Sequence, residues 1–307
     1  MLVISYPKNN LLGGLGDRIL GLISIRLISK LLNKDFYIEW EKEDIKSYID
    51  YSKYDFNLLK DKSDDKKILN MFGRSKRRKA RNYLNIKKPF PNKITKICLN
   101  YELAQFFYKN KSFSDKGDYK KDIINAYEEL WTEILIPTEL LKNKINSIIK
   151  DTKKIVGIQI RCGDLGMITN KGEKESYNNH YPETIKNIKK YLENIKDHIE
   201  IEDYNVFITS DSNDAVNKAK EVWEEDKILY NYDLIQHIDR KAVNNDISKV
   251  FVDSYILSQK SDILYISEYS NFGRIAVLSC GHELIYNLKC EKLKKINMVS
   301  KKIKLFS

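Results

Sequence analysis

A chain of 307 residues, of which 42% are hydrophobic and 32% charged, has enough apolar side chains for one large core or two cores of about 150 residues each. This composition excludes an intrinsically disordered chain. The net charge of +11 favours an anionic ligand, such as nucleic acid, a membrane surface or a nucleotide sugar, and does not choose among them.

The cysteines and the apolar stretches bear on the compartment. The four cysteines form no Cys-x-x-Cys pair, so we expect no zinc site and a reducing compartment. No stretch approaches the roughly 18 consecutive apolar residues of a membrane helix. The apolar run at 2–6 is too short for a signal peptide. We therefore expect a cytoplasmic protein with no transmembrane segment.

The first forty residues predict a β-α-β unit. Residues 2–6 are typical of a short strand, which a glycine-rich turn at 13–16 ends. Apolar residues then recur at helical spacing over 18–32, and 35–40 forms the next predicted strand. A unit of this kind predicts an α/β fold whose parallel sheet carries helices on its faces.

The middle of the chain contains a predicted domain boundary. Residues 60–95 are rich in lysine and arginine with weak periodicity, which predicts a solvated loop or an exposed helix. A helical stretch near 119–150 follows, and the strand pattern then restarts. We place the boundary near residue 150, which gives two domains at 1–150 and 151–307.

The second half alternates predicted strands and helices more regularly. The predicted strands are 155–160, 205–209 and 263–267, and the predicted helices are 182–197, 213–222, 247–259 and 273–278.

The glycine-rich turn is the first candidate ligand site, because backbone N–H groups between a strand and a helix can approach a phosphate. Gly14 and Gly16 match the first two glycines of the dinucleotide motif Gly-x-Gly-x-x-Gly, but Ile19 stands at the third. Glu39 ends the next strand, where a ribose-binding acid is expected. A dinucleotide site, a structural turn and a sugar-nucleotide site all stay open at this point.

Polar residues also follow the predicted strand at 155–160. Arg161 stands at its carboxyl end, where ligands bind in open α/β sheets, and its planar guanidinium can clamp a diphosphate. Asp164 is placed to orient it. The alternative is an arginine that only caps the edge of the sheet.

Two later turns repeat this arrangement. Asp211 and Ser212 follow a strand and precede a helix, so they suit either helix capping or hydrogen bonds from a ribose or a guanine edge. Ser270 opens the next such turn, where the helix amides, with Arg274 nearby, can bind phosphate.

Taken in chain order, these segments resemble the fucosyltransferase superfamily, which includes α-1,6-, nodulation and protein O-fucosyltransferases. Its GGLGNR-type loop is similar to residues 13–18, its HxRR-T/G-D motif to 159–164, its T-D-D/S turn to 209–212, and its D-x-Y-x-L and SSF segments to 253–257 and 270–272. The resemblance covers about 15–275. Two positions depart from it, since Gln159 replaces the family's histidine and Cys162 its second arginine.

The resemblance implies a GT-B-like pair of Rossmann-type domains with a cleft between them, and inverting transfer from GDP-β-L-fucose to a glycan or another hydroxyl acceptor. It places the acceptor on 1–150 and the nucleotide sugar on 151–307. It also implies that Arg161 binds the β-phosphate and stabilises the leaving GDP. The residues expected to bind the donor are Gly14, Gly16, Arg18, Gln159, Asp164, Asp211, Ser212, Asp253, Ser270, Asn271, Phe272 and Arg274.

The expected chemistry uses no cofactor and no metal. The sequence contains no Asp-x-Asp pair, and Arg161 can stabilise the charge that develops on GDP. Asp17, beside the glycine turn, is the first candidate for the general base, followed by His180 and Glu183. The alternative role for Asp17 is to cap the helix or to hold the turn to Arg18.

Two other functions stay open. The basic run 74–81 is typical of a solvated face, but also of a module that binds nucleic acid or an anionic surface. Because it lacks interleaved aromatics, we expect no nucleic acid as a partner. The resemblance implies a GDP-sugar and a glycan as partners instead. Gln159 and Cys162 leave open a homologue that binds a nucleotide sugar without turnover. The sequence does not fix the acceptor, the linkage or the oligomeric state.

Overall fold

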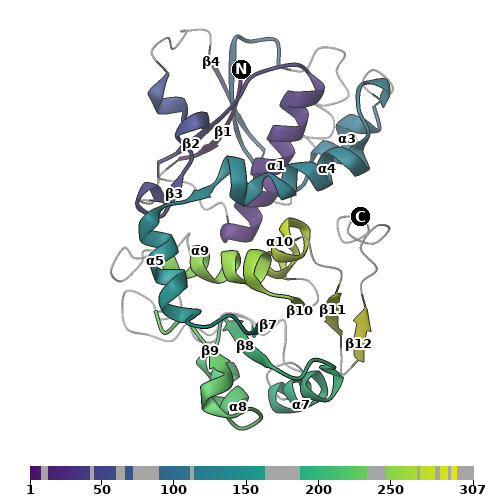
Figure 1. Cartoon of the computed structure of the whole chain (residues 1–307). Coiled ribbons are helices and arrows are strands. Elements are labelled where there is room, and N and C mark those ends of the chain that lie inside the picture. The colour runs from purple at the N-terminus through teal and green to yellow at the C-terminus, as the bar shows by residue number, and fades with distance from the viewer. Residues whose placement is uncertain are drawn as a thin grey trace. The chain divides into compact units, whose positions relative to one another are not determined.

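The structure is a computed structural model that describes residues 1–7, 13–41, 45–59, 66–71, 90–110, 114–162, 187–233, 247–267, 270–280, 284–289 and 292–295. The chain divides into two compact units, Met1–Thr138 and Glu139–Ser307, and each has its own parallel sheet (Figure 1). The division falls before helix α5 (Glu139–Ile148), because this helix packs against α9 (Ser248–Tyr255) of the second unit. The sequence placed the boundary near residue 150.

The first unit contains a parallel sheet in the order β2-β1-β5-β4. Its strands are β1 (Leu2–Tyr6), β2 (Phe36–Trp40), β4 (Lys66–Asn70) and β5 (Ile94–Cys98). Its α-helices are α1 (Leu15–Leu31), α3 (Ala104–Tyr108) and α4 (Tyr119–Glu128), and a π-helical turn, Leu130–Ile134, follows. A small antiparallel sheet pairs β3 (Ile49–Asp50) with β6 (Ile136–Pro137). Short 3₁₀ turns lie at Ile45–Ser47, Ser52–Tyr54, Phe56–Leu58 and Ser114–Lys116.

Strands β1 and β2 and helix α1 form the β-α-β unit that the sequence predicted. All five residues of β1 are buried, as expected in a sheet covered on both faces. Helix α1 contacts α3, α4, β1 and β2, so most of its residues are buried. At Gly21 this helix lies against the backbone just after β5, and an added Cβ at Gly21 would lie 2.1 Å from the carbonyl oxygen of Leu99. The helix begins at Leu15, which places Gly16 in its first turn.

The segment 60–95 contains strand β4 and the start of β5, so the prediction of a loop or an exposed helix is wrong for these residues. Strand β4 lies at the edge of the sheet, where Ile68 is exposed and lysines replace the usual apolar run. Residues 72–89, which include the basic run 74–81, lie outside the described residues.

The second unit contains a sheet in the order β12-β11-β10-β7-β8-β9, in which all neighbouring strands are parallel except β11 and β12. Its strands are β7 (Lys154–Ile160), β8 (Tyr204–Ser210), β9 (Ile228–Leu229), β10 (Ile263–Ser267), β11 (Leu284–Lys289) and β12 (Lys292–Lys295). Besides α5 and α9, its α-helices are α7 (Ile188–His198), α8 (Asn213–Lys220) and α10 (Asn271–Ser279). Shorter turns are the 3₁₀ turn Glu225–Lys227 and the π-helical turn Ile256–Lys260.

The helices of this unit cover both faces of its sheet. Figure 1 shows α7 and α8 on one face and α9 and α10 on the other. Strands β7, β8 and β10 and the helices between them confirm the predicted alternation. Other details differ: β9, β11 and β12 were not predicted, α10 begins at Asn271 instead of Gly273, and the helical stretch near 119–150 contains two α-helices.

Strand order fixes where each sheet can bind a ligand. From β7 the chain continues to β8 and β9 on one side of the sheet, and later to β10 and β11 on the other side. The crevice at such a reversal, outside the carboxyl ends of the strands, is the usual ligand site of an open α/β sheet. In the second unit this point lies between β7 and β10. In the first unit it lies between β1 and β5.

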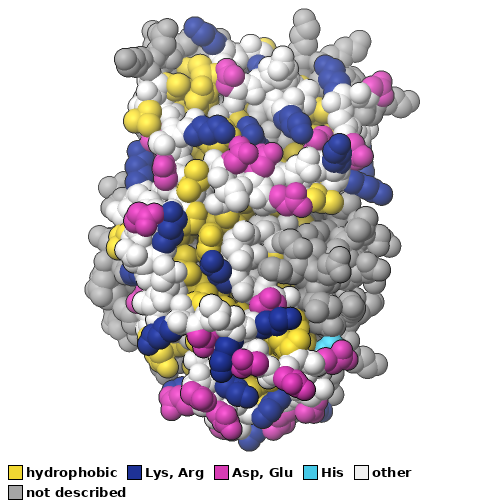
Figure 2. All heavy atoms as spheres, viewed as in Figure 1, with side chains coloured by type: hydrophobic (Ala, Val, Ile, Leu, Met, Phe, Trp, Pro, Cys, Tyr) yellow, Lys and Arg dark blue, Asp and Glu magenta, His cyan; other side chains and the backbone are white. Residues whose placement is uncertain are grey.

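The charged side chains of the described residues are mixed in sign on the face shown in Figure 2, where lysines and arginines alternate with acids. None of the helices among the described residues is both long and apolar enough to cross a membrane.

Candidate functional site

Arg161 lies at the reversal point of the second sheet, directly after β7. Ile160 pairs in register with Ser210 on β8, so the residues that follow the two strands, Arg161 and Asp211, meet side by side. Arg161 Nη1 lies 3.3 Å from Asp211 Oδ2, and the backbone N–H of Arg161 donates to Ser267 Oγ at the end of β10 (2.9 Å). Three adjacent strands therefore hold this arginine, whose side chain is 29% exposed.

Cys162 points into the core. It is fully buried, its backbone N–H donates to Asp211 Oδ1, and its Sγ lies 3.6 Å from Ser210 Oγ. Burial raises the pKa of Cys162 to about 12, and the Asp211 carboxylate adds to this rise, so the thiol is neutral at physiological pH. At this position the chain has a small uncharged group in the core.

Gln159 ties β7 to the end of β10. Its side chain is buried, and its Oε1 accepts a hydrogen bond from Ser267 N (3.3 Å). Ser267 Oγ donates in turn to the backbone carbonyl of Gln159 (3.2 Å). Gln159 therefore supports the edge of the sheet from which Arg161 projects.

Helix α10 begins beside this edge. Ser270 is its N-cap, and the Ser270 hydroxyl accepts a hydrogen bond from Gly273 N (3.3 Å). Asn271 and Phe272 are partly exposed in the first turn, and Arg274 Nη1 donates to Asn271 Oδ1 (3.3 Å). The positive end of a helix and a guanidinium thus lie on one turn, an arrangement suited to an anion.

Ser212 is the N-cap of α8, as the capping alternative predicted. Its hydroxyl accepts a hydrogen bond from Asp214 N (3.2 Å), and its own N–H donates to Ser210 Oγ (3.1 Å). Ser212 is buried, so in this geometry it shapes the turn that presents Asp211.

Asp253 on α9 is the centre of a buried polar cluster. Its Oδ2 accepts a hydrogen bond from Thr209 Oγ1 (2.7 Å) and lies 3.2 Å from Lys249 Nζ, one helical turn earlier. Its Oδ1 accepts a hydrogen bond from Asn231 Nδ2 (3.2 Å). Burial raises the pKa of Asp253, whereas the Lys249 ammonium opposes that rise. Inside the unit, the Asp253 carboxylate thus has hydrogen-bonding partners in Thr209, Lys249 and Asn231.

Lys249 and Asn231 were not among the predicted site residues. Lys249 is buried, and its Nζ also donates to the backbone carbonyl of Asn231 and lies 4.4 Å from the centre of the Tyr230 ring. The spacing of Lys249 and Asp253, four residues apart on a predicted helix, was a usable signal for this pair. Asn231 lies in a turn far from Asp253 in sequence, so no local pattern indicated it.

In the first unit, Asp17 caps helix α1. Its Oδ2 accepts a hydrogen bond from Gly14 N (3.2 Å), which satisfies a backbone donor at the start of the helix. Gly13 has a positive φ of 84°, and a Cβ there would lie 2.5 Å from Asp17 Oδ2. Gly13 is therefore needed for this tight cap, which is the structural role that the sequence left open.

Arg18 is fully buried behind this turn. Its guanidinium lies over the rings of Tyr6 and Trp40, 5.6 and 5.2 Å from their centres, and its Nε donates to the carbonyl of Gly13 (3.3 Å). The residue that was predicted to bind the donor therefore holds the shape of the turn in this structure.

Glu39 is engaged inside the first sheet. Its carboxylate is buried, accepts a hydrogen bond from Ser5 Oγ (2.7 Å) and pairs with Lys96 Nζ. These contacts from β1 and β5 occupy the acid that a dinucleotide site would use for ribose. The geometry therefore favours the other two interpretations of the glycine turn.

Three predicted candidates, Asp164, His180 and Glu183, lie outside the described residues. Within the described part of the chain, no three His, Cys, Asp or Glu side chains gather as a metal site. The glycine-turn candidates belong to the first unit and Arg161 with its neighbours to the second.

No protein-family model matches the sequence, and neither does any curated protein. Solved structures do match the fold. A mutant of FUT1 from Arabidopsis thaliana in complex with GDP aligns with a TM-score of 0.62 and 13% identity, covering 97% of this chain and 73% of that one. NodZ α-1,6-fucosyltransferase soaked with GDP-fucose aligns at 0.62 and 12%, covering 96% and 98%, and NodZ from Bradyrhizobium at 0.59 and 12%, with the same coverage. The predicted GT-B-like α/β fold with parallel sheets is confirmed, and the chain has the fold of these fucosyltransferases.

Proposed function

We propose that the chain is an inverting, metal-independent glycosyltransferase that transfers fucose from GDP-β-L-fucose to a hydroxyl group of a glycan. The observation that carries this proposal is the placement of Arg161 at the reversal point of the second sheet, fixed by Asp211 and Ser267. The fold is that of proteins solved with GDP and GDP-fucose, which supports this donor class.

Arg161 has the central electrostatic role in this mechanism. The acceptor oxygen attacks the anomeric carbon of fucose, the bond from that carbon to the β-phosphate oxygen breaks, and negative charge develops on the GDP. A guanidinium held in place before the reaction stabilises that charge without having to reorganise. This role, together with the lack of an Asp-x-Asp pair, supports a reaction without a metal ion.

The neighbouring elements would hold the rest of the donor. The first-turn amides of α10, at Asn271 and Phe272, and the guanidinium of Arg274 suit the diphosphate. Asp253 suits the guanine edge, since a carboxylate accepts two parallel hydrogen bonds. Because Asp253 is paired with Lys249, guanine binding would require these two side chains to separate in part.

The acceptor proton needs a base. Asp17 remains our first candidate, because it lies at the start of helix α1 beside the glycine turn, where its Oδ2 accepts a hydrogen bond from Gly14 N. The Asp17→Asn variant keeps an oxygen for the cap but removes the base. A turnover number within twofold of wild type in this variant would eliminate Asp17 from the role.

The deciding experiment is a calorimetric titration of the full chain in EDTA with GDP, GDP-fucose, GDP-mannose, UDP-glucose and NAD. We expect GDP and GDP-fucose to bind and the Arg161→Ala variant to lose most of that affinity. Lys218→Ala, an exposed cation on α8 of the same unit, is the matched control. Binding of NAD or UDP-glucose in place of the GDP compounds would overturn the proposal.

A homologue that binds the nucleotide sugar without turnover is the second candidate. Cys162 favours it, because a buried neutral thiol stands where the resemblance has a second arginine. Incubation of the protein with radiolabelled GDP-fucose separates the two. Release or transfer of labelled fucose, lost in Arg161→Ala, identifies the enzyme, whereas donor binding with no release identifies the non-catalytic homologue.

A further inference from the structure

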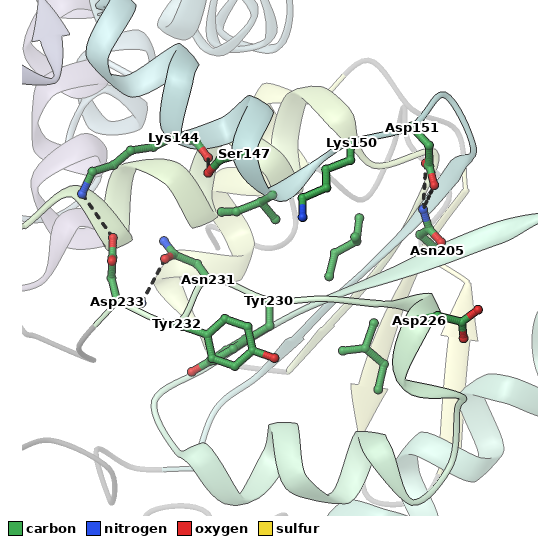
Figure 3. Close-up of a pocket in the computed structure, with 13 residues that line it drawn as sticks. Lys144, Ser147, Lys150, Asp151, Asn205, Asp226, Tyr230, Asn231, Tyr232 and Asp233 are labelled. Atoms are coloured by element: carbon green, nitrogen blue, oxygen red, sulfur yellow. Dashed lines mark hydrogen bonds and ion pairs between the residues drawn. The ribbon is translucent and has the colours of Figure 1, made fainter.

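A pocket lies at the β9 edge of the second unit, with a volume of about 530 Å³ (Figure 3). Helix α5 and the residues just after it form one wall, and β9 with the turn that follows it forms the other. The residues that line it are Lys144, Ser147, Ile148, Lys150, Asp151, Asn205, Asp226, Ile228, Leu229, Tyr230, Asn231, Tyr232 and Asp233. Neither Arg161 nor Asp211 is among them, so the pocket is separate from the proposed leaving-group site.

An exposed aromatic ring stands at the mouth of this pocket. Tyr232 is 74% exposed, which is high for a large apolar side chain. Its ring meets that of Tyr230 edge to face, with centres 5.1 Å apart and planes at 87°. Tyr230 is buried, its hydroxyl donates to Asn213 Oδ1 (3.3 Å), and the ammonium of Lys249 lies over its ring. A fixed ring thus supports an exposed one.

Hydrogen-bonding pairs lie at both ends of the pocket. At one end Lys144 Nζ lies 3.3 Å from Asp233 Oδ2, and at the other Asn205 Nδ2 donates to both oxygens of Asp151 (2.8 and 3.0 Å) (Figure 3). A carboxylate has about four acceptor positions, so each aspartate can still accept from a ligand hydroxyl. Lys150 points into the space between these pairs (Figure 3).

The chemistry of the lining disfavours two classes of ligand. Two lysines, Lys144 and Lys150, face three aspartates, Asp151, Asp226 and Asp233, so the pocket has one more carboxylate than ammonium. The ammonium of Lys249 also lies against Tyr230 and Asn231 of the lining, so the charges nearly balance. The pocket therefore has no cationic cluster that would favour a nucleotide, a sulfated chain or a nucleic acid. The lining combines apolar side chains with charged and amide groups, so a purely apolar ligand is disfavoured because it would leave these polar groups desolvated without hydrogen bonds.

A neutral sugar is neither anionic nor purely apolar, and its groups suit this lining. Each hydroxyl of a sugar both donates and accepts, so it can bond a carboxylate and an amide at once. The C–H face of a pyranose ring can lie on an exposed tyrosine ring, where it replaces water over apolar surface. We propose that this pocket binds a neutral oligosaccharide, with Tyr232 as the stacking platform and the two hydrogen-bonding pairs as anchors.

The pocket also connects to the proposed donor site. Asn231 lines the pocket, and its side chain donates to Asp253. Oligosaccharide binding does not depend on the proposed transferase activity, because Tyr232 and the two hydrogen-bonding pairs are not among the residues proposed to bind the donor. In a transferase, the pocket would hold a part of the glycan acceptor away from the reacting hydroxyl.

The test probes the full chain on an array of neutral, sialylated and sulfated oligosaccharides, followed by calorimetry with the strongest neutral binder. We expect neutral chains to bind and Tyr232→Ala to weaken that binding at least tenfold, with the GDP affinity unchanged. Tyr232→Phe keeps the ring and should retain most of the affinity. Leu140→Ala, which removes an exposed apolar side chain on α5 outside the pocket, is the control.

Three outcomes would overturn the inference: no neutral oligosaccharide binds, acidic chains bind in preference, or Tyr232→Ala binds as tightly as wild type. The GDP titration keeps this inference apart from the proposed function. Loss of oligosaccharide binding with GDP binding intact contradicts only the pocket. Oligosaccharide binding without any GDP binding contradicts only the proposed function.

Discussion

One carboxylate, that of Asp211, holds both the side chain of Arg161 and the backbone that follows it. Oδ2 lies 3.3 Å from Arg161 Nη1, and Oδ1 accepts the N–H of Cys162. Asp211 is buried, whereas the arginine side chain is partly exposed. The aspartate therefore sets the direction of the guanidinium from inside the protein, and we assign Asp211 to positioning instead of nucleotide contact.

This assignment predicts that Asp211→Asn slows fucose transfer about 10-fold to 100-fold, because the neutral amide no longer fixes a guanidinium that must meet the leaving phosphate. The measurement is the initial rate at saturating GDP-fucose, with the melting temperature recorded in parallel. Asp214→Asn, an exposed acid on the next turn of chain, is the matched control. A rate loss that merely follows a fall in melting temperature would mean that Asp211 only stabilises the fold.

The buried pair of Lys249 and Asp253 predicts a large and pH-dependent cost of removing one partner. Lys249→Met should lower the free energy of unfolding by about 3–5 kcal/mol, because it leaves a buried carboxylate without its cation. Burial raises the pKa of Asp253, so the folded state binds a proton more tightly than the unfolded chain. The free energy of unfolding therefore falls as the pH rises from the pKa of this group in the unfolded chain to its higher pKa in the folded state. The deficit of the variant should therefore be smaller at pH 5 than at pH 8.

Urea unfolding at both pH values measures this effect. Lys260→Met, an exposed lysine on the following turn, is the control, and Lys249→Met combined with Asp253→Asn should recover part of the loss. An equal deficit at both pH values would show that Asp253 is not the group responsible.

The sequence predicted the parts of the fold that rest on local patterns. Gly13 to Gly16 between a strand and a helix indicated the first β-α-β unit, and the polar residues after 155–160 indicated the ligand edge of the second sheet. The predicted strands are confirmed, because parallel strands are buried and appear in the sequence as apolar runs, whereas the ligand edge stays a prediction. Strand β4 was missed because it lies at a sheet edge and two of its five residues are lysine.

The site was less predictable than the fold. Motif order named Arg161 and Asp211, but only the strand register shows that the aspartate bonds the arginine. Arg18 was assigned to the donor because it belongs to a motif, whereas its burial between two rings depends on Tyr6 and Trp40 from different strands. Roles that depend on contacts between distant segments have no local sequence pattern.

Glu102 predicts a second pH dependence, in the first unit. Burial raises the pKa of Glu102 to about 7, although its carboxylate accepts a hydrogen bond from Gln105 N (2.9 Å). Ionisation of Glu102 therefore lowers the stability of the folded state as the pH rises from the ordinary pKa of a glutamate to above 7. Glu102→Gln removes that cost, so its stability relative to wild type should increase from pH 5 to pH 8, by at most about 3 kcal/mol.

Thermal unfolding of both proteins over this pH range gives the comparison, and Glu128→Gln, an exposed acid on α4, controls for the loss of one charge. A constant difference between wild type and Glu102→Gln would contradict the raised pKa.

We expect Gly21→Ala to destabilise the protein, although helix propensity alone favours alanine at this position. Alanine in the middle of a helix is favoured over glycine by about 1 kcal/mol. A Cβ at this position, however, would lie 2.1 Å from the carbonyl oxygen of Leu99 and 2.7 Å from its carbonyl carbon, which are backbone atoms that no side-chain rotation can move. We expect Gly21→Ala to cost about 1–3 kcal/mol of stability through this clash, measured by urea unfolding. Lys30→Ala, an exposed position of the same helix, should change stability by less than about 1 kcal/mol. A stabilised Gly21→Ala variant would mean that α1 does not approach the Leu99 segment this closely, and the buried position of α1 in the first unit would then need revision.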